Sequence, residues 1–96
     1  MEKIQSSYQI YDSLKANNDS WYKKTAQKKI YVSTKCNEYD KKNRIHYRIL
    51  LITAQEIILV RKGFLGRRVQ RKTPLICIKG VVYSNESQEF VLLIPT

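Results

Sequence analysis

The sequence has few of the residues from which catalytic and metal sites are built. Its 96 residues include one histidine and two cysteines. His46 is flanked closely by Arg44 and Arg48, where a solvated side chain is expected rather than a catalytic base. Cys36 and Cys77 are too few for a disulfide framework, and neither stands at the spacing of a metal site. We therefore expect a chain that is not an enzyme and that carries no cofactor and no metal.

Glycine is also scarce, and long apolar runs are absent. Gly63 and Gly66 lie close together, but the Lys-Ser/Thr pair of a phosphate-binding loop does not follow them. No segment approaches the roughly 20 consecutive apolar residues of a membrane-spanning helix, and the N-terminus lacks the apolar core of a secretory signal. Hydrophobic residues still make up 43% of the chain, which is enough for a small folded core. These features predict one cytoplasmic folded domain.

Acidic residues are nearly absent from the middle of the chain. The whole sequence holds 18 basic and 8 acidic residues, for a net charge of +10. Residues 41–79 contain eleven of the basic residues and a single acid, Glu56, so this segment alone accounts for the imbalance. A field of one sign attracts anions over about a Debye length, roughly 8 Å at physiological salt. The segment indicates a polyanionic partner, either nucleic acid or anionic lipid, and the simpler alternative is a solvated surface.

The N-terminal part carries a helical pattern. Apolar residues within 4–14 recur at intervals of three and four, the spacing of one helical stripe. Residues 17–20 then favour a turn. Trp21 and Tyr22 follow, and this aromatic pair is suited to anchor the segment to the rest of the chain. The pattern predicts an N-terminal helical arm over residues 1–29.

From Ile30 onward the periodicity becomes that of strands. Apolar and polar residues alternate within short segments, and short polar or glycine-containing turns separate one segment from the next. The expected strands lie at 30–36, 44–52, 56–61, 75–78 with a bend at Gly80 into 81–83, and 90–94, while 67–72 alternates only weakly. The pattern predicts a mainly β (α+β) fold over residues 30–96, a curved antiparallel meander of five or six strands or a partial barrel, with a helix at the N-terminus.

The first expected hairpin gathers cations around its loop. If residues 37–43 form the loop, its lysines stand at the rim and the arginines of the next strand share one face. Arginine binds phosphate oxygens in a bidentate manner, and lysine supplies a point charge. The candidate headgroup-binding residues are Lys41, Lys42, Arg44 and Arg48. Glu38 and Asp40, a close pair of carboxylates, are expected to balance neighbouring lysines.

A second cationic segment lies between Arg61 and Lys72. Phe64 and Leu65 form an apolar pair inside it, with basic residues on both sides. Such a pair is suited to touch a bilayer, because each cation near the surface contributes about 1 kcal/mol and the apolar side chains insert shallowly. The alternative is that the pair folds back onto the end of the sheet. The candidate membrane-contact residues are Arg61, Lys62, Phe64, Leu65, Arg67 and Arg68.

Several short segments, in the same order and spacing, resemble the tail-homology domain of class I myosins. They are NEYDKK (37–42), YRILLIT (47–53), EIILV (56–60), RKTPL (71–75), IKGV (78–81) and FVL (90–92). The resemblance covers roughly residues 30–94 and implies a pleckstrin-homology-like fold, a strongly curved seven-stranded sheet closed by a C-terminal helix, that binds anionic phospholipids and phosphoinositides. In that family a basic residue of the first hairpin loop and an arginine of the next strand contact the headgroup. The positions that match are Lys41 or Lys42, and Arg48, with Arg44 as a helper.

The chain departs from the family pattern at its end. Thr96 follows what would be the fifth strand, so the resemblance implies an incomplete domain, or one in which the N-terminal helix takes the place of the closing helix. A strand at 91–94 left at the edge of the sheet favours pairing with a protein partner or with a second copy as a homodimer.

Three functions stay open at this point. The first is a module that binds anionic phospholipid membranes, peripheral at the membrane or the cell cortex and linked to the actin–myosin cortex. The second is nucleic-acid binding by a small basic β domain. Its seven tyrosines could stack on bases, but only Tyr47 lies inside the cationic segment. The third is a protein-interaction scaffold that docks a partner on the strand at 91–94.

Overall fold

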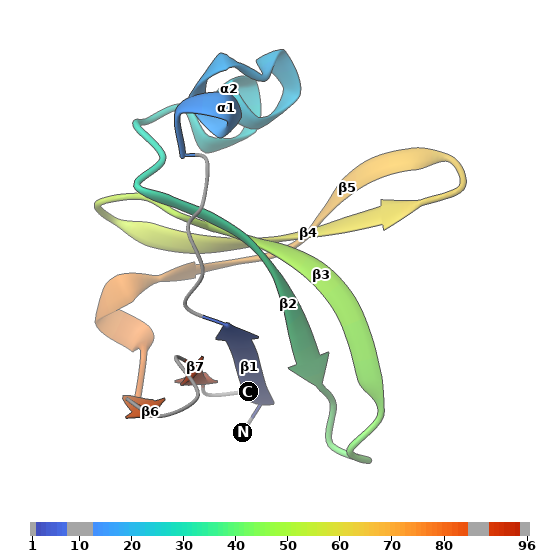
Figure 1. Cartoon of the computed structure of the whole chain (residues 1–96), viewed down its shortest axis with the longest axis vertical. Coiled ribbons are helices and arrows are strands. Elements are labelled where there is room, and N and C mark those ends of the chain that lie inside the picture. Colours follow the sequence, from blue (N-terminus) through green and yellow to red (C-terminus); the bar gives the residue numbers. More distant parts are fainter. Residues whose placement is uncertain (1, 8–12, 85–88, 95–96) are drawn as a thin grey trace.

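The computed structural model of the chain describes residues 2–7, 13–84 and 89–94, and its main feature is one antiparallel sheet (Figure 1). Two short helices lie together near one end of this sheet. In chain order the elements are β1 (Glu2–Ser7), α1 (Ser13–Asn18), α2 (Ser20–Ala26), β2 (Val32–Tyr39), β3 (Ile45–Ile52), β4 (Glu56–Gly63), β5 (Gly66–Pro74), the 3-10 helix η1 (Leu75–Cys77), β6 (Gly80–Ser84) and β7 (Glu89–Ile94).

The strands form one sheet in the order β5-β4-β3-β2-β1-β7-β6. Every neighbouring pair is antiparallel, and β2 to β5 follow one another as a meander of hairpins. β5 and β6 stand at the two ends of this order, so the sheet is open rather than closed. The expected fold class, a mainly β curved meander or partial barrel with a helix near the N-terminus, is confirmed.

The N-terminal segment enters the sheet, and the helix expected over residues 4–14 is wrong in its first part. Glu2–Ser7 form β1, in which Ile4 pairs with Glu38 of β2 on one side and with Leu92 of β7 on the other. Ile4 is fully buried. Hydrogen bonding to two neighbouring strands outweighs a helical spacing of apolar residues, which is a weak signal over so short a segment. Residues 8–12 of the expected helix lie outside the described part of the chain.

The helical part of the N-terminal segment is the pair α1 and α2. The break expected at residues 17–20 is present but shorter, because α1 runs to Asn18 and α2 begins at Ser20, which leaves Asp19 between them. Asp19 caps α2, since its Oδ1 accepts hydrogen bonds from the backbone amides of Trp21 (3.0 Å) and Tyr22 (3.1 Å). The Asn17 side chain makes two hydrogen bonds to the backbone of Ile30, each at 2.9 Å. Its Nδ2 donates to the carbonyl, and its Oδ1 accepts from the N–H. These bonds tie the helix pair to the chain segment that leads into β2.

The C-terminal strand lies inside the sheet. β7 pairs with β1 on one side and with β6 on the other, and its Leu92 and Ile94 are buried. The expectation of an exposed edge at 91–94 that docks a partner or a second copy is therefore wrong, because the backbone groups of this strand are already bonded within the chain. The segment after Pro74 also differs from expectation, since Leu75–Cys77 form η1 rather than a strand.

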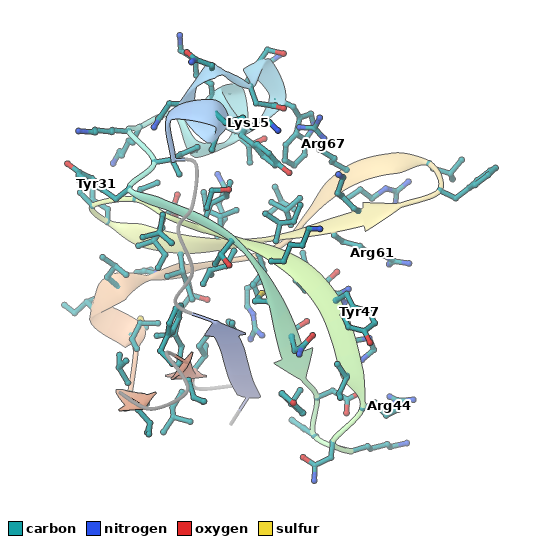
Figure 2. All side chains as sticks on the ribbon, in the orientation of Figure 1. Lys15, Tyr31, Arg44, Tyr47, Arg61 and Arg67 are labelled. Carbon is teal, nitrogen blue, oxygen red and sulfur yellow. The ribbon has the colours of Figure 1, made fainter. Side chains whose placement is uncertain are left out.

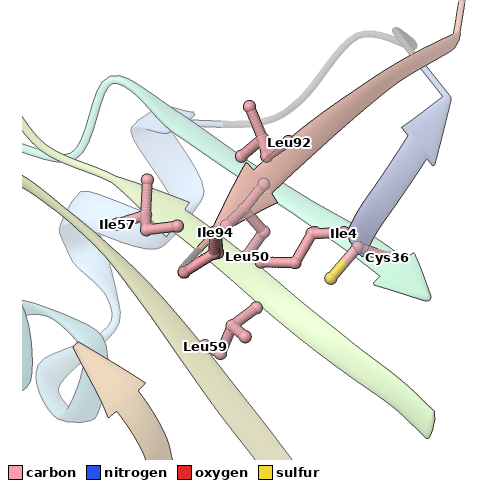
Figure 3. Close-up of a cluster of buried hydrophobic side chains, with 7 residues drawn as sticks. All are labelled: Ile4, Cys36, Leu50, Ile57, Leu59, Leu92 and Ile94. Atoms are coloured by element: carbon pink, nitrogen blue, oxygen red, sulfur yellow. The ribbon is translucent and has the colours of Figure 1, made fainter. Parts of the chain in front are cut away.

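The sheet buries apolar side chains on both of its faces. One cluster, drawn in Figure 3, brings β1 and β7 together with β2, β3 and β4, and we call this side the inner face. The other cluster packs under α1 and α2, and we call this side the helix face. In β4, Ile57 and Leu59 belong to the inner face, whereas Ile58 and Val60 belong to the helix face. Burial on both sides explains why β4 is a continuous apolar run.

A bulge in β5 decides which of its arginines faces which side. The ladder between β4 and β5 shifts register between Leu59 and Val60, which leaves Gln70 as an extra residue of β5. Arg71 therefore shares the inner face with Leu59, whereas Arg67 is turned to the helix face. Without the bulge the two arginines would lie on the same side, because they are four positions apart and side chains alternate with a period of two.

Candidate functional site

The loop between β2 and β3 is a tight, internally bonded turn that presents two lysines. Asp40 Oδ1 accepts hydrogen bonds from the backbone amides of Lys42 (2.8 Å) and Arg44 (2.9 Å). Asn43 closes the turn with a positive φ of 59°, a conformation that asparagine tolerates better than most residues. Lys41 and Lys42 are exposed. The backbone of this tip is thus held by Asp40, and the two lysine side chains project from it.

Two acidic side chains, one in β2 and one just after it, pair with two arginines, one just before β3 and one in it. Arg44 Nε donates to Asp40 Oδ2 at 2.8 Å, and Arg48 Nε donates to Glu38 Oε1 at 3.2 Å. His46 Nε2 lies 3.1 Å from the same Asp40 oxygen. The expectation that these two carboxylates balance lysines is wrong. They balance arginines, because the hairpin register places them on the same face of the sheet as the arginines.

Glu38 is the centre of a buried ion-pair triad on the inner face. Its side chain is 7% exposed, and that of Arg48 is 12% exposed. Its second oxygen accepts a hydrogen bond from Arg71 Nη2 at 2.9 Å. Burial lowers the pKa of Arg71, but a guanidinium stays charged at any physiological pH. Arg48 is therefore held on the inner face, away from the exposed lysines of the loop.

The four residues expected to bind a headgroup do not form one exposed cluster. Lys41 and Lys42 are exposed together, the side chain of Arg44 is 67% exposed but paired with Asp40, and Arg48 is largely buried. Their role in headgroup binding stays a prediction.

The β4–β5 hairpin carries an exposed apolar pair at its tip. Gly63 pairs with Gly66, so Phe64 and Leu65 are the two residues of the turn. Gly66 has a φ of 107°, which side chains other than glycine rarely adopt. Phe64 is 103% exposed and Leu65 83% exposed, so the pair does not fold back onto the sheet. Figure 1 shows this hairpin reaching beyond the rest of the sheet.

Four cations stand on the strands directly behind this tip. Arg61 lies opposite Arg68, and Lys62 lies opposite Arg67. Arg67 is turned toward the helices, where its Nη1 donates to Asp19 Oδ1 at 2.8 Å. Arg61 and Arg68, together with the tip, line an open cleft of about 240 Å³. The hairpin thus brings all six expected membrane-contact residues onto one projecting element.

Five cations of the two hairpins have no acidic partner in the part of the chain that the structure describes. Among the described residues, no carboxylate lies within ion-pair distance of Lys41, Lys42, Arg61, Lys62 or Arg68. We call these five cations, with Phe64 and Leu65, the hairpin surface. Figure 2 labels Arg61 on the β4–β5 hairpin and Arg44 beside the β2–β3 loop, which locates the two hairpins that carry this surface. Uncompensated charge of one sign produces a potential that draws anions.

Comparison with known families identifies the kind of domain that carries this surface. A family model described as unconventional myosin tail, actin- and lipid-binding, matches residues 8–95, which is most of the chain. The chain belongs to the unconventional myosin tail family. The resemblance noted in the sequence is thereby confirmed at the level of the family. Searches of curated proteins and of solved structures gave no match.

The description of the unconventional myosin tail family names binding functions, to actin and to lipid. Within the described residues of this family member, no helix is long and apolar enough to cross a bilayer. The described residues also hold no group of three histidine, cysteine or acidic side chains that could bind a metal ion. Burial raises the pKa of the Cys36 thiol to about 12, so this cysteine is neutral and unreactive at physiological pH.

Sequence reasoning missed one set of contacts in this myosin tail chain, the one around Arg67. Its guanidinium carbon lies 4.7 Å from the centre of the Tyr22 ring and 5.7 Å from that of Trp21, in addition to the ion pair with Asp19. The aromatic pair anchors the helices to the helix-face cluster, as expected. The cap position of Asp19 was detectable from the sequence, but its pairing with Arg67 depends on the β5 bulge, for which no sequence signal was evident.

The hydrogen bonds that close the β2–β3 loop lower the pKa of the Asp40 carboxyl. The backbone amide of Arg44 and the His46 side chain, in that order, hold the pKa of this carboxyl far below its ordinary value of 3.8. Because the pKa in the folded chain is the lower one, the bonds of Asp40 stabilise the fold above the ordinary pKa and are lost as the pH falls through the lowered one. We expect the ¹³C signal of the Asp40 carboxyl to show a carboxylate still ionised at pH 3.8. A midpoint at or above that pH would contradict the closed loop.

Proposed function

We propose that this chain binds the anionic surface of membranes through the hairpin surface, with phosphoinositide headgroups as its preferred ligands. Lys41 and Lys42 contact headgroup phosphates from the β2–β3 loop. Phe64 and Leu65 insert between lipid headgroups from the tip of the β4–β5 hairpin, and the cations behind them contact the phosphates. Because the family description names both lipid and actin, we also propose that the chain resides at the membrane or the cell cortex.

One observation carries this proposal, namely the combination of charge and apolar exposure on the same projecting hairpin. Phe64 and Leu65 are almost fully exposed, and Arg61, Lys62 and Arg68 stand directly behind them without acidic partners among the described residues. In water an exposed apolar pair of this kind contributes nothing to the stability of the fold. At a membrane its side chains leave water while the cations face the phosphates, which is the arrangement of peripheral anchors.

Arg44 and Arg48 have a lesser part in this proposal. Each already holds a carboxylate, Asp40 and Glu38 respectively, so a headgroup phosphate has to displace that carboxylate before it can bind. The displacement is easier at the exposed Arg44 than at Arg48, because an exposed ion pair contributes little and a buried one leaves an uncompensated charge when broken. We therefore assign the first contact to the lysines and a supporting contact to Arg44.

The lysines of the β2–β3 tip provide the direct test of headgroup binding. We expect Lys41→Ala with Lys42→Ala to weaken partitioning onto vesicles that contain phosphatidylinositol bisphosphate by about 30-fold, since each cation near an anionic surface contributes about 1 kcal/mol. Among the described residues neither lysine side chain makes a hydrogen bond or an ion pair, and the backbone amide of Lys42 that bonds Asp40 is kept in the variant, so thermal unfolding should not change. Sedimentation with vesicles of matched size measures both the wild type and the variant.

Two comparisons make this experiment decisive. Lys23→Ala with Lys24→Ala removes the same charge from the exposed side of α2 and should change partitioning little. Equal binding of the wild type to vesicles with and without the acidic lipid would reject the proposal. A single-stranded oligonucleotide that binds more tightly than the vesicles would favour the nucleic-acid alternative instead.

A further inference from the structure

The first half of β3 turns apolar side chains to the solvent. Leu51, near the end of this strand, is buried in the cluster under the helices, and Ile49 packs against the same cluster. Ile45 and Tyr47 lie on the same side of the strand as these two, because side chains alternate with a period of two. Ile45 is 49% exposed, however, and Tyr47 is 80% exposed. An apolar stripe therefore runs out from under the helices along the open arm of the β2–β3 hairpin.

The polar side chains of this arm are on the opposite side, the inner face. His46 lies 3.1 Å from Asp40, and Arg48 donates to Glu38. This is the reverse of an ordinary half-covered sheet, in which apolar side chains face the core and polar ones face water. Single exposed apolar residues are normal on a protein surface, but two neighbours at the end of a continuous apolar stripe form a patch. The arm thus keeps its apolar side available for a contact outside the fold.

This patch adjoins both hairpins of the hairpin surface. Ile45 is three residues from Lys42 of the β2–β3 loop, and Tyr47 follows about 7 Å further along the strand. Across the sheet, Val69 of β5 is 41% exposed and lies on the same side, because it pairs with a residue of β4 that pairs with Ile49. Figure 1 shows the β2–β3 and β4–β5 hairpins diverging from the sheet, and in Figure 2 the Tyr47 side chain extends from β3 on the side where they diverge. A bilayer that meets both tips therefore also faces the patch.

The charges on either side of the patch identify its partner as an anionic bilayer. Lys42 and Lys62 are exposed on the two adjoining hairpins, and among the described residues neither has a carboxylate within ion-pair distance. The two acids of the β2–β3 hairpin, Glu38 and Asp40, are already paired with arginines. Tyrosine is well suited to the boundary of headgroups and acyl chains, because its ring is apolar and its hydroxyl stays hydrated. An aromatic and aliphatic pair bordered by cations matches that boundary in an acidic membrane.

We propose that Ile45 and Tyr47 form a further bilayer contact, which inserts into the boundary of headgroups and acyl chains along the open arm of the β2–β3 hairpin. The Tyr47 ring and the Ile45 side chain leave water there, while the Tyr47 hydroxyl stays among the headgroups. The β2–β3 hairpin then lies along the membrane surface, with its lysine tip and its apolar side both in contact. The inference deepens the proposed function and rests on it, because it adds an apolar contact to a surface that charge brings to the membrane.

The test is sedimentation of the whole chain with vesicles that contain phosphatidylinositol bisphosphate, at two salt concentrations. Ile45→Thr with Tyr47→Thr removes both apolar side chains but keeps residues that favour a strand. We expect this variant to partition about tenfold more weakly, since each side chain leaves water only in part. The loss should be the same at about 0.1 M and about 0.5 M salt, because an apolar contact is not screened, whereas the loss caused by Lys41→Ala with Lys42→Ala should shrink at the higher salt.

A matched pair of side chains provides the control. Tyr31→Thr with Ile76→Thr removes the same two residue types from exposed positions, one at the opposite end of β2 from the loop and one in η1. It should leave partitioning unchanged, and thermal unfolding should be unchanged for both double variants. Tyr47→Thr alone, at the more exposed position, should still weaken partitioning by about threefold, so the test holds even where Ile45→Thr lowers the unfolding temperature.

The outcomes separate this inference from the proposed function. Partitioning of Ile45→Thr with Tyr47→Thr like the wild type, while the variant without the two lysines binds weakly, would overturn the inference and leave the proposed function standing. The reverse result would support the inference and reject the headgroup contact of the lysines. An equal loss for the control pair would overturn the inference, and so would a loss of binding to a single-stranded oligonucleotide with unchanged vesicle binding, which would assign Tyr47 to base stacking. A wild type that binds no vesicles would reject both.

Discussion

Replacing Glu38 with alanine is expected to lower the free energy of unfolding by about 3 kcal/mol, which is a large part of the stability of a small domain. Glu38 is the shared partner of Arg48 and Arg71, at 3.2 and 2.9 Å, and its side chain is 7% exposed. Removing the carboxylate takes away the acid that Arg48 and Arg71 share, while the two guanidinium groups stay close together on the inner face. The loss comes mainly from this broken pairing of a buried acid and not from the area that the side chain buries.

A matched acid on the same sheet serves as the control for this prediction. Glu56 is 27% exposed and lies 4.0 Å from Lys72, so Glu56→Ala should cost less than about 1 kcal/mol. Urea unfolding followed by circular dichroism measures both variants. A cost for Glu38→Ala no larger than that for Glu56→Ala would mean that the triad does not hold the two arginines on the inner face.

Replacing Phe64 and Leu65 together with serine is expected to reduce partitioning onto anionic vesicles by about 30-fold while leaving thermal unfolding unchanged. Full burial of one such side chain contributes about 1.5–3 kcal/mol, and shallow insertion of two recovers about 2 kcal/mol in total. The fold does not depend on either side chain, because both are exposed at the tip of the hairpin. A change in membrane binding without a change in stability identifies a surface that works only at the bilayer.

Ile76 provides the control for the tip. It is 91% exposed in η1, so it is as accessible to a membrane as Leu65 but belongs to neither cationic hairpin. Ile76→Ser should leave partitioning unchanged. An effect as large as that of the double tip variant would place the membrane contact on a different side of the molecule.

The strands of the meander could be predicted because the burial of their side chains follows a clear period along the sequence. Alternation in β2 and the continuous apolar run of β4 both follow from which faces of these strands are covered. β1 could not be predicted in the same way. Its place between β2 and β7 depends on partners far away in sequence, and its own residues carry a short pattern that favours a helix.

The exposed residues of the candidate site could be predicted from the sequence, but the pairing of its charged side chains could be predicted only in part. The apolar pair at 64–65 and the lysines at 41–42 are local features of two turns, and the structure exposes them. The pairing of Glu38 with Arg48 follows from the register of the hairpin, and it could have been anticipated from the alternation on both strands. The direction of Arg67 could not, because a single extra residue in β5 reverses the alternation.

The central claim is that the two hairpin tips are the parts of the chain that meet the membrane. Paramagnetic broadening of amide signals, with a spin label on the headgroups of bicelles that contain phosphatidylinositol bisphosphate, tests this claim most directly. The account predicts the strongest broadening at Phe64 and Leu65, a weaker effect at Lys41 and Lys42, and none at Val82 in β6. Strongest broadening at Val82, with the two tips unaffected, would contradict it.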